Sequence, residues 1–215
     1  MTMVRRLPSI APYDLPREEA LPPSRADWRL DPVRAALLVH DMQAYFVDAF
    51  APDSAPIAPA TDAIASLIAA ARSSDVPIFY TAQNGDQDRR DRGLQADLWG
   101  PGMRQVPEHQ VVVAPLAPRD GDFVLVKHRY SAFQRSNLET LMRARGRDQI
   151  IICGVYAHIG CLLTAGEAFQ RDIQPFFVGD ALADFSRDWH DAALALVADC
   201  CGVVLSVRQT VKALT

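Results

Sequence analysis

The chain has 215 residues, and its 49% hydrophobic and 22% charged residues are typical of one globular domain with a full core. Its net charge of −4 argues against a nucleic-acid-binding protein, which would carry a basic face. No apolar run approaches the roughly 18 residues of a membrane-spanning helix, and the first residues lack the apolar segment of a secretion signal. We therefore expect a cytoplasmic protein with no nucleic-acid or membrane partner.

The cysteines and histidines show no pattern of a metal site. The four cysteines contain no CxxC pair, and Cys200 and Cys201 are adjacent, which is a poor geometry for an ordinary disulfide. The five histidines have no spacing typical of zinc ligands. We expect reduced thiols, no metal and no cofactor.

In chain order, a proline-rich arm precedes one patterned domain. Residues 1–33 have no regular period, which predicts an extended arm wrapped over the domain or over a partner. Residues 34–215 are expected to form a single domain. Within it, short and nearly continuous apolar runs predict buried parallel strands at 35–40, 76–81, 123–127, 149–153, 175–179 and 202–206.

Segments with a helical period lie between the predicted strands. Residues 57–72 carry an apolar stripe on one face, formed by Ile57, Ile64, Leu67, Ile68 and Ala71. Residues 136–139 have the pattern of a capping box, and Gly146 would end that helix. A third helix is expected over 160–171. Ser186 is expected to cap a fourth, with core-facing residues Ala192, Ala193, Leu196 and Val197.

This alternation predicts an α/β fold, a three-layer α/β/α sandwich around a doubly wound, mainly parallel six-stranded sheet. In such folds, ligands bind in the crevice at the carboxyl ends of the strands. The stretch 83–122 has the weakest pattern, and a long loop of this kind in a compact domain is often a functional lid.

Two of the predicted strands end on an ionisable side chain. Asp41 follows 35–40, and Lys127 closes the run 123–127. Burying either charge alone is unfavourable, so a mutual ion pair would explain both positions. The pair could be catalytic or a structural salt bridge, and Asp41 could also only cap the turn after its strand.

Six short segments carry a more specific pattern: 38–43, 80–83, 98–102, 129–133, 154–160 and 180–186. Together they resemble the isochorismatase family, in particular its members in siderophore and phenazine biosynthesis, and the likeness runs in register from Pro8 to about Val207. The resemblance implies the three-layer fold, Asp41 and Lys127 as catalytic residues, and a homodimer or higher homo-oligomer.

The wider superfamily also contains cysteine amidohydrolases, which resemble this chain at the same aspartate and lysine. Aligned on Thr164 and Ala165, their nucleophile falls on Gly160 and not on Cys161. One step along a helix turns a side chain by about 100°, so we expect Cys161 to be a packing residue. Without a nucleophile, covalent acyl transfer by the usual route is not available.

Glycine at position 160 suits isochorismatases, whose substrates carry an enolpyruvyl vinyl ether. Protonation of the terminal methylene carbon gives an oxocarbenium ion, water adds, and the hemiketal collapses to pyruvate and an alcohol. Asp41 would donate the proton and then stabilise the cation. Lys127 lowers the pKa of Asp41, so we expect burial under Phe46 and Trp99, together with a dianionic substrate, to raise it again.

The resemblance also implies the residues that bind a small dicarboxylate substrate. Gln83 and Arg92 match ligand-contacting positions, although Arg92 lies in a charged stretch typical of a solvated surface. Tyr130 and Tyr156 would hydrogen-bond the ring substituents, and Gly160 would leave room for substrate or water. Phe46 and Trp99 would form apolar walls, although any of these aromatic residues could instead belong to the core.

Several points stay open at this stage. His158 is expected to be structural, and His128 stands where the family has tryptophan. Residues 92–94 resemble the phenazine type, whereas 159–161 and 180–183 resemble the siderophore type, so isochorismate and 2-amino-2-deoxyisochorismate are both candidate substrates. The alternatives to an isochorismatase are a non-catalytic docking module for a carrier protein or synthetase, and an amidohydrolase.

Overall fold

A parallel six-stranded sheet forms the centre of the molecule. The computed structural model describes residues 7–215, so residues 1–6 of the predicted arm lie outside the described part. The strand order is β3-β2-β1-β4-β5-β6, and all five pairings are parallel. The strands are β1 (Ala35–His40), β2 (Ile78–Ala82), β3 (Phe123–Val126), β4 (Gln149–Val155), β5 (Gln174–Ala183) and β6 (Val203–Leu205). The predicted three-layer fold is confirmed, with a sheet that is parallel throughout.

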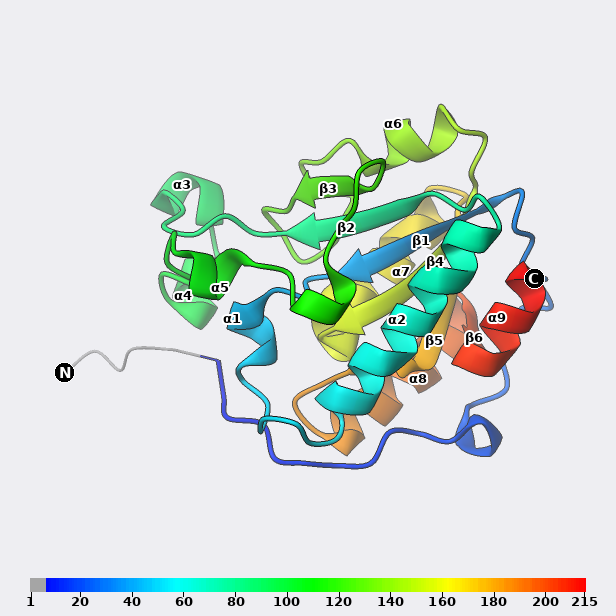
Figure 1. Ribbon diagram of the computed structural model, residues 1–215, viewed down its shortest axis with the longest axis horizontal. Helices are drawn as coiled ribbons and strands as arrows, with labels where there is room; N and C mark the ends of the chain where they lie inside the picture. The colour runs from blue at the N-terminus through cyan, green and yellow to red at the C-terminus, as the bar shows by residue number, and fades with distance from the viewer. Residues whose placement is uncertain (1–6) are drawn as a thin grey trace.

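Helices cover both faces of this sheet. One face packs against α2 (Ile57–Ser73) and α9 (Val207–Leu214), which lie in front of the sheet in Figure 1. The other face packs against α6 (Leu138–Arg143), α7 (Leu162–Gln170) and α8 (Arg187–Cys200). Because both faces are covered, every residue of β1 and β4 is buried, which explains why these strands are continuous apolar runs in the sequence.

The helix predictions were correct for α2 and partly wrong for α8. All five predicted stripe residues of α2 are buried. Ser186 caps α8 as predicted, since its Oγ accepts a hydrogen bond from the Trp189 N–H. The buried stripe of α8 is nevertheless shifted by one residue, because Ala192 and Leu196 are exposed while Leu194 and Ala198 are buried. Apolar residues surround this helix, so the pattern did not determine which face packs inward.

The predicted capping box at 136–139 is wrong. Helix α6 begins at Leu138 after Asn137, whose side chain makes no capping bond. Glu139 instead forms an ion pair with Arg171, at 2.5 Å between Oε2 and Nη1. The capping box of this structure lies at Ser206 and Gln209, where it starts α9, a helix that the sequence reading did not predict.

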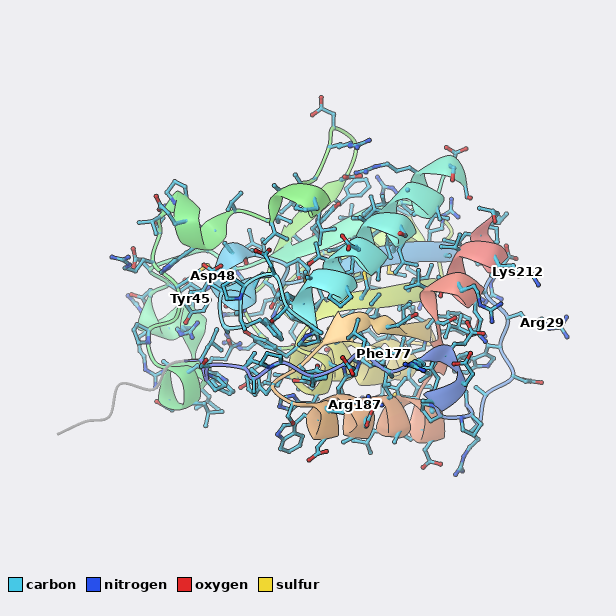
Figure 2. All side chains as sticks on the ribbon, turned by 60° about the horizontal axis from the view of Figure 1, so that its bottom comes forward. Arg29, Tyr45, Asp48, Phe177, Arg187 and Lys212 are labelled. Carbon is cyan, nitrogen blue, oxygen red and sulfur yellow. The ribbon has the colours of Figure 1, made fainter. Side chains whose placement is uncertain are left out.

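The direction in which the chain crosses the sheet reverses beside β1, whose neighbours are β2 and β4. Such a switch point leaves a crevice at the carboxyl ends of the strands. Short helices gather at this end: α1 (Ala44–Val47), α3 (Arg89–Arg92), α4 (Gln95–Trp99) and α5 (Pro107–Gln110). Figure 2 labels Tyr45 and Asp48 at the same end, and Lys212 at the opposite end. Three of these helices come from the stretch 83–122, which the sequence left unpatterned.

Residues 7–33 run along the outside of the domain and are mostly extended, apart from the short 3-10 helix η1 (Glu18–Ala20) (Figure 1). Ile10 forms an isolated bridge with Phe50 near the crevice end. Further along, the Arg25 N–H donates to the Ala198 carbonyl at the end of α8. The Val204 N–H donates to Ser24 Oγ, so the arm is bonded to β6 as well.

Gly154 marks a close approach of β4 to β1. Its φ is +114°, and a Cβ added there would lie 2.2 Å from the His40 carbonyl oxygen. We predict that Gly154→Ala lowers the free energy of unfolding by roughly 2–5 kcal/mol, since it adds both backbone strain and overpacking. Gly166→Ala in α7 is the matched control, because its added methyl group meets open space. Urea unfolding measures both variants, and equal stabilities would contradict the prediction.

Candidate active site

Asp41 stands directly after β1, in the turn that leaves the sheet. Its φ of +50° lies in the left-handed region, which aspartate tolerates better than most residues. The Thr81 hydroxyl donates to Asp41 Oδ1 at 2.6 Å and accepts from the Asp41 N–H at 3.0 Å. Because β2 pairs with β1 at His40 and Thr81, the sheet register itself positions this hydroxyl.

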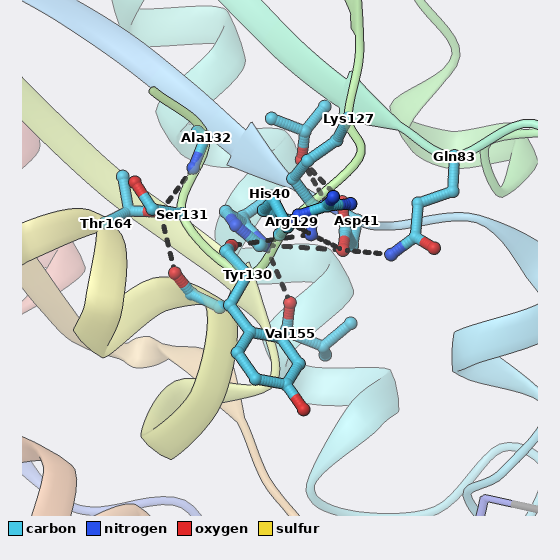
Figure 3. Close-up of polar contacts among 12 residues, drawn as sticks. His40, Asp41, Gln83, Lys127, Arg129, Tyr130, Ser131, Ala132, Val155 and Thr164 are labelled. Carbon is cyan, nitrogen blue, oxygen red and sulfur yellow. Dashed lines mark hydrogen bonds and ion pairs between the residues drawn. The ribbon is translucent and has the colours of Figure 1, made fainter. Parts of the chain in front are cut away.

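Lys127 follows β3 and reaches Asp41 across the end of β2. Its Nζ lies 2.8 Å from Asp41 Oδ2, so the predicted contact is present. The ammonium also donates to the Arg129 and Tyr130 carbonyls, at 2.8 and 3.4 Å (Figure 3). Lys127 is only 2% exposed and Asp41 only 5%. The three N–H groups of a buried lysine therefore all have acceptors, as a stable buried ion pair requires.

The environment fixes the charge states of Asp41 and its neighbour His40. Burial raises the pKa of the Asp41 carboxyl, but the Lys127 charge and the hydrogen bonds from Lys127 and Thr81 outweigh burial and lower it. Asp41 is therefore ionised in the free protein at neutral pH. Burial lowers the pKa of His40 to about 4, so its imidazole is neutral. Its Nδ1 donates to the Val155 carbonyl at 2.9 Å.

One pocket beside this pair brings together every site residue that the sequence predicted. Its lining includes Asp41, Phe46, Gln83, Arg92, Trp99, Lys127, Tyr130, Tyr156 and Gly160. The structure adds lining residues that the sequence reading did not single out: Leu7, Tyr45, Gln95, Val155, Ile159 and Phe185. The predicted residues come from five separate parts of the chain, and the switch point is where these parts meet.

Aromatic side chains form much of the pocket wall, and their polar atoms are already bonded within the protein. The Trp99 Nε1–H donates to the Tyr130 hydroxyl oxygen at 2.6 Å. The Tyr156 hydroxyl donates to the Phe46 carbonyl at 2.8 Å, so toward a ligand this hydroxyl can only accept. The Tyr156 and Phe185 rings pack at 4.6 Å between centroids. The Tyr130 hydroxyl accepts from Trp99 and, unlike that of Tyr156, keeps its proton to donate to a ligand.

Arg92 is a buried cation without an acidic partner in the part of the chain that the structure describes. It is 7% exposed, and its Nε donates to the Gly100 carbonyl at 2.6 Å. No described carboxylate lies within 4 Å of its guanidinium. Gly102 permits this packing, since a Cβ there would lie 2.5 Å from the Arg92 guanidinium carbon. Among the described residues, two cations and one carboxylate line the pocket, which therefore favours an anionic ligand.

Two residues that the sequence reading missed hold the predicted ones in place. Gln43, itself 1% exposed, bonds both the N–H and the carbonyl of Gln83, at 2.7 and 2.9 Å. The Gln83 amide then points at Asp41 Oδ2 from 3.4 Å (Figure 3). Gln95 donates to the His128 carbonyl at 3.1 Å and so joins α4 to the loop after β3. Gln43 could have been found as an amide close to the end of an apolar strand, whereas Gln95 lies in the unpatterned stretch 83–122 and carries no such signal.

The two histidines discussed from the sequence lie outside the pocket lining. His158 Nδ1 lies 2.5 Å from the fully buried Asp184, and its ring stacks on Trp189 at 4.7 Å. These contacts agree with the expected structural role of His158. His128 does not line the pocket, and its backbone carbonyl accepts a hydrogen bond from the lining residue Gln95.

The fold and the site define a class: doubly wound α/β proteins with a buried aspartate–lysine pair at the switch point. The isochorismatase domain model matches residues 35–209. The chain belongs to the isochorismatase family. The predicted family resemblance is therefore confirmed.

Similar proteins come from several bacteria. The chain is 49% identical to "Isochorismatase" of Bacillus subtilis (strain 168), over 91% of this chain and 62% of that protein. It therefore spans less than two thirds of the length of that relative. It is 46% identical to "Phenazine biosynthesis protein PhzD" of Pseudomonas fluorescens, over 95% and 98% of the two chains. A cysteine hydrolase from Pseudomonas syringae pv. phaseolicola 1448A has a similar structure, with a TM-score of 0.79, 27% identity, and 90% and 97% coverage.

The ion pair makes a prediction about stability and pH. In the native protein the pKa of Asp41 is lower than in the unfolded chain, where it is about 4. The ion pair therefore adds to the free energy of unfolding above about pH 4, and this stabilisation is lost as the pH falls through the pKa of the folded state. In Lys127→Met, burial without a cation raises this pKa, so stability is lost as the pH rises through the folded value. We expect a loss of roughly 3–5 kcal/mol at pH 8 and less at pH 5.

Urea unfolding at the two pH values measures this effect. Adding Asp41→Asn to Lys127→Met should remove the pH dependence, because no buried carboxylate remains. Arg90→Met serves as the matched control, since the Arg90 side chain is 92% exposed. Equal losses for Lys127→Met at both pH values would show that Asp41 is not the group responsible.

Proposed function

We propose that the protein hydrolyses the enolpyruvyl vinyl ether of isochorismate or of 2-amino-2-deoxyisochorismate, releasing pyruvate and a dihydro-aromatic acid. The observation that carries this proposal is the buried Asp41–Lys127 pair beside Gly160, with no nucleophilic side chain at that position. Family membership and the names of the similar proteins support it. Such a reaction belongs to the biosynthesis of secondary metabolites of the siderophore or phenazine type.

The reaction needs an acid that protonates carbon. Asp41 transfers a proton to the terminal methylene group, and the vinyl ether becomes an oxocarbenium ion. The Asp41 carboxylate then lies beside this cation and stabilises it. Water adds to the cationic carbon and loses one proton, which restores protonated Asp41 or passes to solvent. The hemiketal then breaks the bond between its central carbon and the ether oxygen attached to the ring; this oxygen takes up a proton and leaves as the alcohol, while the hemiketal hydroxyl loses its proton and becomes the keto group of pyruvate.

Asp41 must gain its proton in the complex, since it is ionised in the free protein. A substrate carboxylate beside it raises its pKa by like-charge repulsion, and loss of water from the pocket acts in the same direction. Lys127 holds Oδ2 and Thr81 holds Oδ1, so the carboxyl group cannot rotate away from the substrate. Lys127 thus orients the acid and stabilises the carboxylate that each turnover regenerates.

The anionic substrate is recognised through charge. Arg92 has a buried guanidinium with no carboxylate partner among the described residues, and a planar guanidinium binds a carboxylate in two places. Gln83 and Gln95 add amide groups to the same pocket. Phe46, Trp99 and Tyr156 would enclose the ring, which is consistent with the apolar walls that small-molecule pockets use.

Neither alternative function gains support. A cysteine amidohydrolase needs a thiol at position 160, and the thiol next to it, Cys161, is fully buried in the core. A non-catalytic docking module has no need for an intact aspartate–lysine pair with all its hydrogen bonds. The similarity to a cysteine hydrolase structure is therefore one of fold.

We predict that Asp41→Asn lowers kcat by roughly 10²–10⁴-fold, because the amide cannot donate the proton. Pyruvate release, coupled to lactate dehydrogenase, measures the rate with each of the two candidate substrates. In D2O the native protein should place one deuterium in the pyruvate methyl group. The kcat/KM value should fall as the pH rises, since only protonated Asp41 reacts and its pKa is lowered in the free protein. Near-normal turnover by Asp41→Asn would exclude this mechanism.

A second prediction concerns Arg92. Arg92→Met should lower kcat/KM by about 10–150-fold, mainly through KM, because one charged hydrogen-bonding group to the substrate carboxylate is lost. Arg90→Met is the matched control two residues away on the exposed side of the same short helix. If both variants keep native kcat/KM, the carboxylate is bound elsewhere.

We also propose that the chain forms a homodimer or higher homo-oligomer in the cytoplasm. Leu94, Leu98 and Leu163 are exposed and line one groove between α4 and α7, an apolar feature that supports a protein interface. Within residues 7–215, no helix is long and apolar enough to cross a bilayer. Light scattering after size exclusion measures the mass, and 23.7 kDa at every concentration would contradict an oligomer.

A further inference from the structure

The imidazole of His40 fills the space that any side chain at position 160 would need. A Cβ added to Gly160 would lie 2.2 Å from Cε1 of His40, and 3.0 and 3.1 Å from its Nε2 and Nδ1. Real non-bonded carbon atoms do not approach so closely. Gly160 lies in the π-helical turn η3 (Ala157–Cys161), which leads into α7, and an added Cβ at Gly166 within α7 meets nothing within 4 Å. The crowding therefore belongs to the His40–Gly160 pair and not to the helix as a whole.

Neither member of this pair is free to move away. His40 is fully buried in β1, where its Nδ1 is bonded to the Val155 carbonyl and its backbone pairs with Gly154 of β4. The Gly160 carbonyl accepts a hydrogen bond from Thr164 Oγ1 at 2.6 Å. The same Thr164 oxygen accepts from the Ala132 N–H at 3.0 Å, which joins α7 to the loop that follows Lys127.

The crowded position lies inside the pocket. Gly160 lines it together with Asp41 and Lys127, so a side chain at 160 would stand beside the ion pair. His40 Nδ1 lies 3.8 Å from Asp41 Oδ2, which places the ring next to the acid as well. The size of the side chain at position 40 thus decides whether position 160 can carry a side chain next to Asp41 and Lys127.

We infer that His40 is a specificity-determining residue, whose ring keeps position 160 free of any side chain and so keeps a nucleophile out of the pocket. With the ring in place, the pocket can use Asp41 only as an acid toward a bound substrate. Without it, position 160 could hold a thiol beside Asp41 and Lys127, the arrangement that attacks acyl carbon. The crowding itself does not depend on the proposed function; only the statement of which reaction His40 permits rests on it.

A double-mutant cycle tests the crowding. Gly160→Ala should lower the Tm by roughly 5–10 °C in the native background, through overpacking. In the His40→Val background, which lacks the outer ring atoms, the same change should lower the Tm by less than about 2 °C. Gly166→Ala in both backgrounds is the matched control. Equal losses from Gly160→Ala in the two backgrounds would overturn the inference.

Failure to fold also decides the question. If the Gly160→Ala variant is insoluble in the native background but soluble in the His40→Val background, the inference is supported. If it is insoluble in both backgrounds, the inference is contradicted. If His40→Val alone does not fold, His40→Asn replaces it, because its shorter amide keeps an N–H for the Val155 carbonyl. None of these measurements uses substrate, so they stand apart from any failure of the proposed activity.

Thiol chemistry gives an independent readout that a purely structural role would not move. Gly160→Cys is made with and without His40→Val, both in a Cys200→Ser background because Cys200 is an exposed thiol. With His40→Val present, we expect iodoacetamide to alkylate position 160 about tenfold faster, since the thiol gains room and Lys127 favours its thiolate. Mass spectrometry locates the label, with buried Cys161 as internal control. Equal rates would overturn the inference.

Discussion

One buried charge pair is the constraint on which the rest of this structure depends. Asp41 and Lys127 are almost inaccessible to water, and each would be strongly destabilising without the other. Because β2 separates β1 from β3, Lys127 has to cross the end of β2, where Thr81 completes the hydrogen bonding of the carboxylate. The pair therefore exists only when the strand order, the register of β1 with β2 and the loop after β3 are all in place.

The residues around this pair determine which of two reaction types, acid catalysis or nucleophilic catalysis, the site can support. An aspartate held by a lysine could serve either as an acid toward substrate or as the base for a neighbouring nucleophile. The choice depends on the place where His40 of β1 meets Gly160, in the π-helical turn η3 (Ala157–Cys161) before α7, because the space between them holds only one of two side chains. A single strand residue that never lines the pocket thus influences what the pocket can do.

The short helices at the carboxyl ends of the strands supply a second positive charge to the pocket, that of Arg92. Arg92 comes from a stretch of charged residues typical of solvated surface, and sequence composition favoured that interpretation. The structure instead buries its guanidinium on Gly102 and Gly100, with no described carboxylate beside it. Because this cation lines the pocket, an anionic ligand would give it the charged partner that it lacks, so the burial that costs free energy in the free protein favours binding.

The sequence by itself determined the fold class and the two ends of the ion pair. A parallel strand covered on both faces has to be apolar throughout, so β1 and β4 are visible as runs, and the aspartate that ends β1 stands out. Lys127 follows an apolar run too, but the prediction that this run is buried was wrong, because β3 is an edge strand on which Val124 and Val126 are exposed. Only the tertiary structure decided which face of α8 is buried, that Arg92 is buried, that Gln43 holds Gln83, and that His40 lies against Gly160. These outcomes depend on distances between residues far apart in the chain, and such distances are set by the packing of whole elements and not by any local pattern.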